Sequence, residues 1–210
     1  MSILALIIEI QLITMSGALA PGPLSIASIY HGTSTGKFSG LKIALGHTIV
    51  EFPLYILIGF GLIKLIWFSG VTAYLSIIGG IALLYFTIPL FKYQHSSNLS
   101  AANKGIYARP ILTGIILSGL NPYFIIWWLT VGAKLILDII EVLGYGLYTL
   151  IYVLHVWMDY AWLLILSYLG YSSLKALSSK YIKIISIILG ILMLYFAFNF
   201  IIDGIRALLS

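Results

Sequence analysis

The chain alternates between long apolar runs and short polar connections. Six apolar runs, each near or above the ~20 residues that an α-helix needs to cross a bilayer, follow one another. The connections between them are rich in Gly, Ser, Asn and Lys, which are turn and interface residues. The pattern predicts an all-α membrane protein with six transmembrane helices. We place these helices at about 3–30, 41–66, 71–91, 109–133, 142–170 and 182–208.

Composition points to the same class of protein. Hydrophobic residues make up 61% of the 210 residues and charged residues only 8%. A soluble domain carries roughly 25% charged residues, so this chain cannot cover a water-facing surface. Its net charge of +5 is spread over the connections, which excludes a nucleic-acid-binding surface, and the lack of Cys excludes disulfides, thiolate metal sites and cysteine nucleophiles. We expect a single transmembrane domain over residues 1–210, in the plasma membrane and without a cofactor.

The distribution of basic residues predicts the orientation of the helices. Eight Lys and Arg residues lie in or beside the first, third and fifth connections, and three lie on the opposite side. Positive residues are enriched in cytoplasmic loops, so we expect the eight in the cytoplasm and both termini outside.

The longest polar connection, residues 92–105, divides the chain into halves of about 1–100 and 105–210. Each half holds three predicted helices, which is an odd number. The second half therefore enters the membrane upside down relative to the first. This predicts two inverted three-helix repeats, an arrangement that is typical of secondary transporters.

Two histidine–acid pairs lie within the apolar runs. His47 and Glu51 are four residues apart, as are His155 and Asp159, and each member of the second pair follows its counterpart by 108 residues. A spacing of four places both groups on one face of a helix. An ionisable residue in hydrocarbon costs at least ~2.5 kcal/mol, so it usually faces the protein interior and has a function. We interpret the acids as proton or cation carriers and the histidines as relays or hydrogen-bond partners; the alternative is a structural network that holds helices together.

Two of the apolar runs contain a helix-breaking sequence. The first run holds Pro21, Gly22 and Pro23, and the fourth holds Asn121 and Pro122, with the two breaks about 101 residues apart. Proline removes a backbone donor and clashes with the preceding turn, and glycine adds conformational freedom. Interrupted helices at matching places in two halves indicate a substrate-binding site, since their ends offer free N–H groups. Kinks that serve packing alone are the alternative.

Three other functions are compatible with parts of this pattern. Two His and two carboxylates can bind a divalent transition metal, but only if the second and fifth helices face each other. An intramembrane enzyme needs a nucleophile beside its base, and Ser25, Ser28 and Thr48 are the nearby hydroxyls, although no triad is recognisable. A passive channel does not need titratable groups in two matched pairs.

The two breaks and their surroundings resemble the signatures of the LysE/RhtB amino-acid exporters. The N-terminal signature is similar to Pro21-Gly22-Pro23 followed by Gly36, Gly40 and Ala44-Leu45-Gly46, and the fourth-segment signature to Leu112-Thr113-Gly114 through Leu120-Asn121-Pro122. The resemblance covers nearly the whole chain. It implies efflux of amino acids or related small organic solutes, driven by an ion gradient, and a homodimer.

One position departs from that resemblance. The family commonly has a basic residue after the fourth-segment proline, whereas this chain has Tyr123. This removes a cation that could hold a substrate carboxylate. The wider superfamily includes exporters of cadmium and manganese, so the histidine–acid pairs keep a divalent-cation exporter as the alternative. We expect a proton-coupled exporter of small organic solutes in the lipid bilayer, and not an enzyme.

Overall fold

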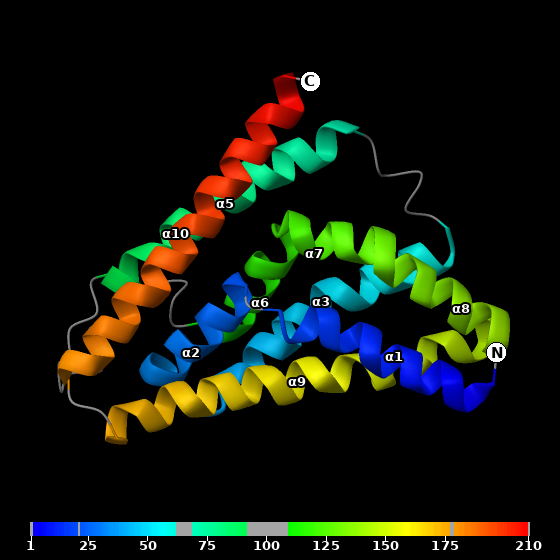
Figure 1. Cartoon of the computed structure of the whole chain (residues 1–210), viewed down its shortest axis with the longest axis horizontal. Coiled ribbons are helices and arrows are strands. Elements are labelled where there is room, and N and C mark those ends of the chain that lie inside the picture. The colour runs from blue at the N-terminus through cyan, green and yellow to red at the C-terminus, as the bar shows by residue number, and fades with distance from the viewer. Residues whose placement is uncertain (1, 21, 62–68, 92–108, 177–178, 210) are drawn as a thin grey trace.

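The computed structural model describes residues 2–20, 22–61, 69–91, 109–176 and 179–209, and all regular elements in these ranges are helices (Figure 1). In chain order they are α1 (Ile3–Ala18), α2 (Pro23–Thr35), α3 (Ser39–Gly59), α5 (Ser69–Phe91), α6 (Pro110–Gly119), α7 (Pro122–Trp127), α8 (Ala133–Leu143), α9 (Tyr145–Ala176) and α10 (Ser179–Leu209), with a π-helical turn at Trp128–Gly132 between α7 and α8.

The first predicted helix break is confirmed. The axes of α1 and α2 differ by 70°, and the extended backbone of Gly22 (φ −147°, ψ −177°) leads into α2. Pro23 occupies the first position of α2, where a helix needs no N–H and the fixed φ of proline fits. Pro21 lies outside the described residues.

The second break is also present, and a side chain stabilises it. α6 ends at Gly119 and α7 begins at Pro122. The side-chain oxygen of Asn121 accepts hydrogen bonds from the backbone N–H groups of Tyr123 and Phe124, at 3.1 and 3.3 Å. These two N–H groups have no acceptor within the helix, so Asn121 is an N-cap.

The predicted end of the fourth apolar segment at residue 133 is wrong. The chain stays helical to Leu143, and only Gly144, with φ +73°, separates α8 from α9. The charged residues of α8 do not end the helix, because α8 is amphipathic and buries Leu135, Ile136 and Ile139 on its other face. The polar connection expected between the fourth and fifth segments is therefore part of a helix.

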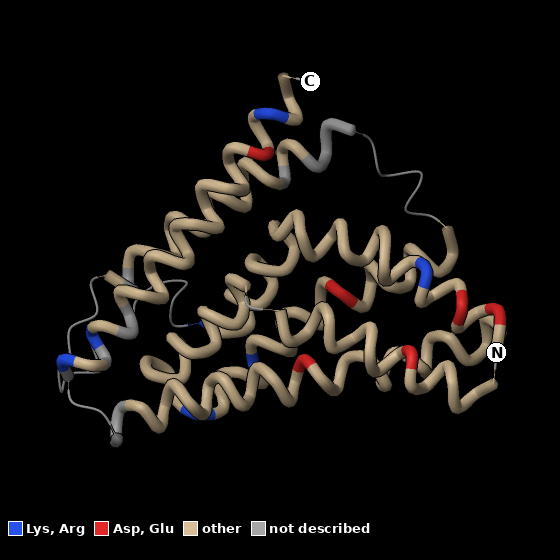
Figure 2. Tube along the Cα trace, viewed as in Figure 1, with Lys and Arg blue, Asp and Glu red and all other residues tan. Residues whose placement is uncertain are grey.

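Four helical stretches among the described residues are long and apolar enough to cross a bilayer. They are Ser39–Gly59, the continuous stretch Pro122–Leu143 that contains α7 and α8, Tyr145–Ser173 and Ile187–Leu209. The number is five if α1 and α2 form one bent span. The protein is thus a multi-pass, all-helical membrane protein, while the number of six spans stays a prediction. Charged residues are sparse along the helices, and Figure 2 shows some of the acidic positions at the end of the molecule that holds α8 and the N terminus, with others in the middle and near the C terminus.

At one end of α3 and α9, glycines allow the backbones of neighbouring helices to touch. A Cβ atom on Gly46 of α3 would lie 2.0 Å from the carbonyl oxygen of Ile111 on α6, and one on Gly32 of α2 would lie 2.1 Å from that of Ser167 on α9. No larger residue fits at either position. Small residues at membrane helix contacts permit such close packing.

Aromatic side chains fill the other end of the same helices. Tyr55 of α3 stacks on Tyr148 of α9 with ring centroids 5.3 Å apart, and its hydroxyl donates to the Tyr148 carbonyl at 2.7 Å. Trp128 packs edge-on against Tyr55 and is fully buried. The histidine–acid pairs lie along α3 and α9 between these rings and the glycine contacts.

α5 and α10 run antiparallel, side by side (Figure 1), with a reciprocal contact. A Cβ on Gly80 would lie 2.8 Å from the carbonyl oxygen of Ala197, and a Cβ on Gly204 would lie 2.8 Å from that of Ala73. Gly204 follows Gly80 by 124 positions, and Ala197 follows Ala73 by the same number. A local two-fold axis between antiparallel helices produces this kind of exchange.

Candidate functional site

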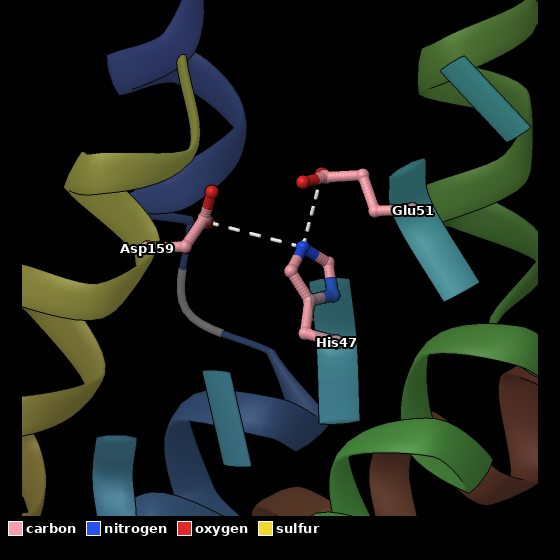
Figure 3. Close-up of side chains that lie close together, drawn as sticks. All are labelled: His47, Glu51 and Asp159. Atoms are coloured by element: carbon pink, nitrogen blue, oxygen red, sulfur yellow. Dashed lines mark hydrogen bonds and ion pairs between the residues drawn. The ribbon is translucent and has the colours of Figure 1, made fainter. Parts of the chain in front are cut away.

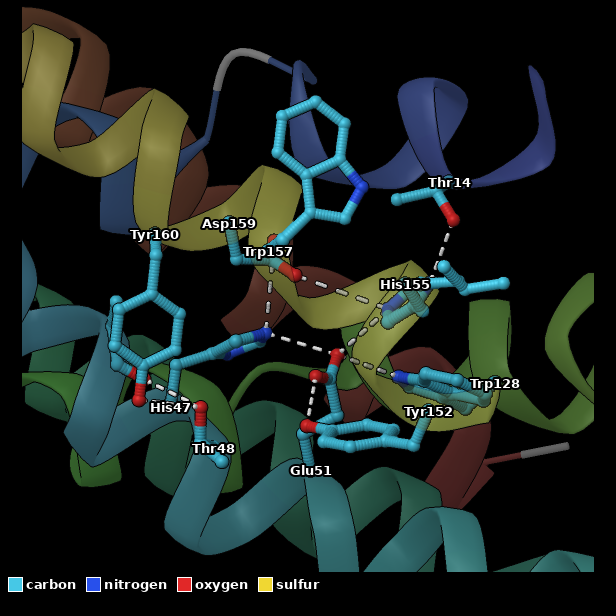
Figure 4. Close-up of polar contacts among 12 residues, drawn as sticks. Thr14, His47, Thr48, Glu51, Trp128, Tyr152, His155, Trp157, Asp159 and Tyr160 are labelled. Atoms are coloured by element: carbon cyan, nitrogen blue, oxygen red, sulfur yellow. Dashed lines mark hydrogen bonds and ion pairs between the residues drawn. The ribbon is translucent and has the colours of Figure 1, made fainter. Parts of the chain in front are cut away.

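The two histidine–acid pairs meet in one buried cluster between α3 and α9 (Figure 4). His47 and Glu51 come from α3, and His155 and Asp159 come from α9. Their relative exposures are only 5%, 2%, 5% and 7%, so none of them faces lipid. α3 and α9 therefore face each other, which is the condition that the sequence set for a shared metal site.

Glu51 is the centre of the cluster and accepts hydrogen bonds on both oxygens. Its Oε1 lies 3.0 Å from His47 Nε2, 3.3 Å from His155 Nε2 and 3.2 Å from Trp128 Nε1. Its Oε2 accepts the hydroxyl of Tyr152 at 2.6 Å. Each carboxylate oxygen has about two acceptor sites, so the three donors crowd Oε1, whereas Oε2 accepts from one donor.

The second ring nitrogen of each histidine contacts a hydroxyl on a broken helix. His47 Nδ1 lies 2.7 Å from Ser118 Oγ on α6, and His155 Nδ1 lies 2.8 Å from Thr14 Oγ1 on α1. When Nε2 donates to Glu51, the Nδ1 of a neutral imidazole accepts from the hydroxyl. Each histidine therefore connects Glu51 to the helix that precedes one of the two breaks.

Asp159 has different surroundings from Glu51. Its Oδ1 lies 4.0 Å from His47 Nε2 and its Oδ2 lies 3.9 Å from His155 Nε2, both too long for hydrogen bonds. The Oδ2 atom is buried and has no hydrogen-bond partner. Figure 3 shows His47 between the two acids, with Glu51 at the shorter distance. The two predicted pairs are thus related by spacing but differ in their contacts.

A cavity of about 270 Å³ adjoins the cluster and reaches both helix breaks. All four members of the cluster line it, as do Gly22 and Pro23 at the first break and Asn121 at the second; Pro122 is buried but does not line it. No Lys or Arg is among its described lining residues. Tyr123 lines it too, and its hydroxyl donates to Asp203 at 3.3 Å.

Three cluster residues are close enough to share a metal ion. One ligand atom each from His47, Glu51 and Asp159 lie within 4.8 Å of one another. Imidazole and carboxylate groups suit a divalent transition metal. The Oε1 atom of Glu51 already accepts three hydrogen bonds, however, so metal binding through this atom requires Glu51 to give up at least one of them.

The hydroxyls considered for an enzyme do not contact a histidine. Ser25 donates to the Ala20 carbonyl at 3.4 Å, Thr48 to the Ala44 carbonyl at 2.9 Å, and Ser28 Oγ has no partner. Ser118, His47 and Glu51 do follow the order of a hydrolase triad. The same order recurs with Thr14 and His155 around the same Glu51, which fits two equivalent anchors better than one nucleophile.

Four cluster partners were not identified from the sequence, namely Thr14, Ser118, Trp128 and Tyr152. Tyr152 precedes His155 by three residues and so lies on the same helix face, a signal that was available. Ser118 directly precedes the end of α6, where a hydroxyl can reach a neighbouring helix. The position of Trp128 depends on the π-helical turn that begins there, and no sequence pattern marks it.

Comparisons with known proteins identify one family. A family model described as LysE type translocator matches residues 15–204. This range includes the four residues of the cluster and all of their partners named above except Thr14. Neither the curated proteins nor the solved structures gave a match.

Proposed function

The chain belongs to the LysE type translocator family, and on this premise we propose that it is a secondary exporter that exchanges protons for a small organic solute. The proposed cargo is an amino acid or a related small molecule. The proposed location is the plasma membrane, with both termini outside and a homodimer as the assembly.

One observation carries this proposal. Four titratable side chains from two helices converge beside a cavity that also touches both helix breaks. Buried ionisable groups in a membrane are expensive and mark ion or substrate pathways. A carboxylate that gains and loses a proton next to a solute cavity is the minimum that proton-coupled transport needs. Protonation of Glu51 and Asp159 is the proposed coupling step.

Alternating access by two inverted repeats, about 1–100 and 105–210, is the proposed mechanism. Three features support it. The two helix breaks are matched, and His47 and His155 from the two halves both contact the Glu51 carboxylate. The third feature is the pair of matching α5–α10 contacts made by Gly80 and Gly204. The glycine contacts and the aromatic packing lie at opposite ends of α3 and α9. Loosening one end while the other stays packed would open the cavity to each side in turn.

Export of a divalent cation is the second candidate, and the grouping of His47, Glu51 and Asp159 favours it. We rank it lower because the Oε1 atom of Glu51 already accepts from three donors within the protein. A metal also requires both the imidazole and carboxylate lone pairs, whereas here each Nε2 is placed to donate a hydrogen.

Transport by the purified protein in proteoliposomes tests this proposal. A pH gradient should drive accumulation of at least one member of a panel of labelled amino acids and amines, and Glu51→Gln or Asp159→Asn should abolish it. Zn²⁺, Cd²⁺ and Mn²⁺ should neither be transported nor bind at micromolar concentration. Saturable cation binding that is lost in both His47→Gln and His155→Gln would replace the organic-solute exporter by the cation exporter.

A further inference from the structure

The two acids of the cluster differ in how much of their binding capacity is free. Glu51 accepts from four donors, one of which is the N–H of the fully buried Trp128. A proton or a cation that bound the Oε1 atom of Glu51 would leave one of its three donors without an acceptor, at the cost of a buried unpaired polar group. Of the two acids, Glu51 therefore has the less freedom to exchange a ligand.

Asp159 has the opposite character. Its side chain is only 10% exposed, its Oδ2 has no hydrogen-bond partner, and it lines the cavity. A buried carboxylate oxygen without a partner is unfavourable unless a ligand supplies one. Asp159 is thus the acid of the cluster with an unused acceptor for an exchangeable cation.

The rest of the cavity lining suits an organic cation. The aromatic residues Phe124, Trp127 and Phe196 line it, and aromatic faces attract cations and pack against apolar groups. No Lys or Arg of the described lining competes for Asp159. An ammonium group attached to an apolar body fits both features.

We propose that Asp159 binds the protonated amine of the transported solute, and that the amine and a proton occupy this carboxylate in turn. This rests on the proposed exporter function and names the chemical group that its site recognises. The arriving ammonium pairs with the Asp159 carboxylate while the proton that Asp159 carried passes to water, so charge is conserved. The titratable groups that face Asp159 are His47 and Glu51 of α3 and His155 of α9, and α7 adds Tyr123 to the same cavity.

Three probes with a common apolar body separate the ammonium from the carboxylate of a substrate. Leucine carries both groups, isoamylamine only the ammonium and isocaproate only the carboxylate. Calorimetric titration of the purified wild-type protein should show binding of leucine or isoamylamine, or of both, and none of isocaproate. Binding of leucine alone would show that an amino acid is required, and binding of isoamylamine would show that the amine suffices. Binding of isocaproate, or no binding of any probe, would overturn the inference.

Variants of the two acids test the division of roles. Asp159→Asn should weaken amine binding by about 30-fold or more and remove its dependence on pH, because no proton then competes at this position. Asp159→Glu should restore part of the affinity and the pH dependence. Glu51→Gln should lower affinity but keep the pH dependence, since the competing proton is bound at Asp159. Thermal unfolding of each variant in detergent checks that it is folded.

The two possible failures are distinguishable. Unchanged amine binding in Asp159→Asn, or loss of the pH dependence only in Glu51→Gln, would overturn the assignment to Asp159 and leave the exporter proposal standing. Wild-type protein that binds amines through Asp159 but moves no solute in proteoliposomes would refute the exporter proposal and leave the binding assignment standing.

Discussion

His155 of α9 lies 3.3 Å from Glu51 of α3, across 104 residues of chain. The same Glu51 oxygen also lies 3.0 Å from His47, one turn away on its own helix. One carboxylate therefore holds a histidine from each half of the chain. Each histidine in turn contacts a hydroxyl on a broken helix, Ser118 or Thr14. A change in the bonding of this carboxylate is thus positioned to affect both breaks.

The hydroxyl of Tyr152 should contribute strongly to the stability of the cluster. It donates to Glu51 Oε2 at 2.6 Å in a buried setting. We expect Tyr152→Phe to lower the free energy of unfolding by about 2 kcal/mol, because a hydrogen bond to a charged group is lost and the carboxylate oxygen stays buried. Thermal or denaturant unfolding in detergent measures this. Tyr168→Phe, at a residue that is 54% exposed, is the matched control and should have little effect; equal effects of the two variants would contradict the arrangement of the cluster.

The glycine contact between α3 and α6 should not tolerate a side chain. A Cβ on Gly46 would lie 2.0 Å from the Ile111 carbonyl oxygen, so the two backbones must separate. We expect Gly46→Ala to lower the free energy of unfolding by about 3 kcal/mol. Gly146→Ala, with nothing within 4 Å of its Cβ, should change it by less than about 1 kcal/mol. A Gly46→Ala protein as stable as the Gly146→Ala protein would show that these helices are not in contact.

Much of the fold and of the candidate site follows from the sequence. The apolar runs, the two breaks and the shared faces of the two histidine–acid pairs depend on local spacing, which the chain states directly. The end of α8 does not follow from local spacing, because the charged residues Lys134 and Asp138 are typical of a connection, whereas one apolar face of that helix is buried. Contacts that depend on tertiary packing, such as Trp128 on Glu51, leave no such local pattern.

The unequal roles of the two acids illustrate the same limit. Sequence spacing presents Glu51 and Asp159 as equivalent members of a repeat. In the structure the longer side chain of Glu51 accepts from four donors. The shorter side chain of Asp159 is too far from both imidazoles for a hydrogen bond. A difference of one methylene group matters only once the separation of α3 and α9 is known.

The orientation predicted from the basic residues can be checked with single cysteines, since the chain has none of its own. Lys37 lies exposed between α2 and α3, and Glu141 lies exposed near the end of α8. We expect Lys37→Cys to react with an impermeant thiol reagent only from the cytoplasmic side and Glu141→Cys only from outside. Labelling in the reverse sense would refute the orientation, and labelling of both positions from one side would refute the membrane path between them.

The most direct test of the central claim is the proton flux that accompanies transport. Wild-type proteoliposomes loaded with a pH-sensitive dye are exposed to a concentration gradient of the transported solute, without an imposed pH gradient. The account predicts that solute moving in one direction drives protons in the other at a fixed ratio, and that Asp159→Asn abolishes both fluxes. Solute movement with no accompanying proton flux would contradict proton coupling at the cluster of His47, Glu51, His155 and Asp159.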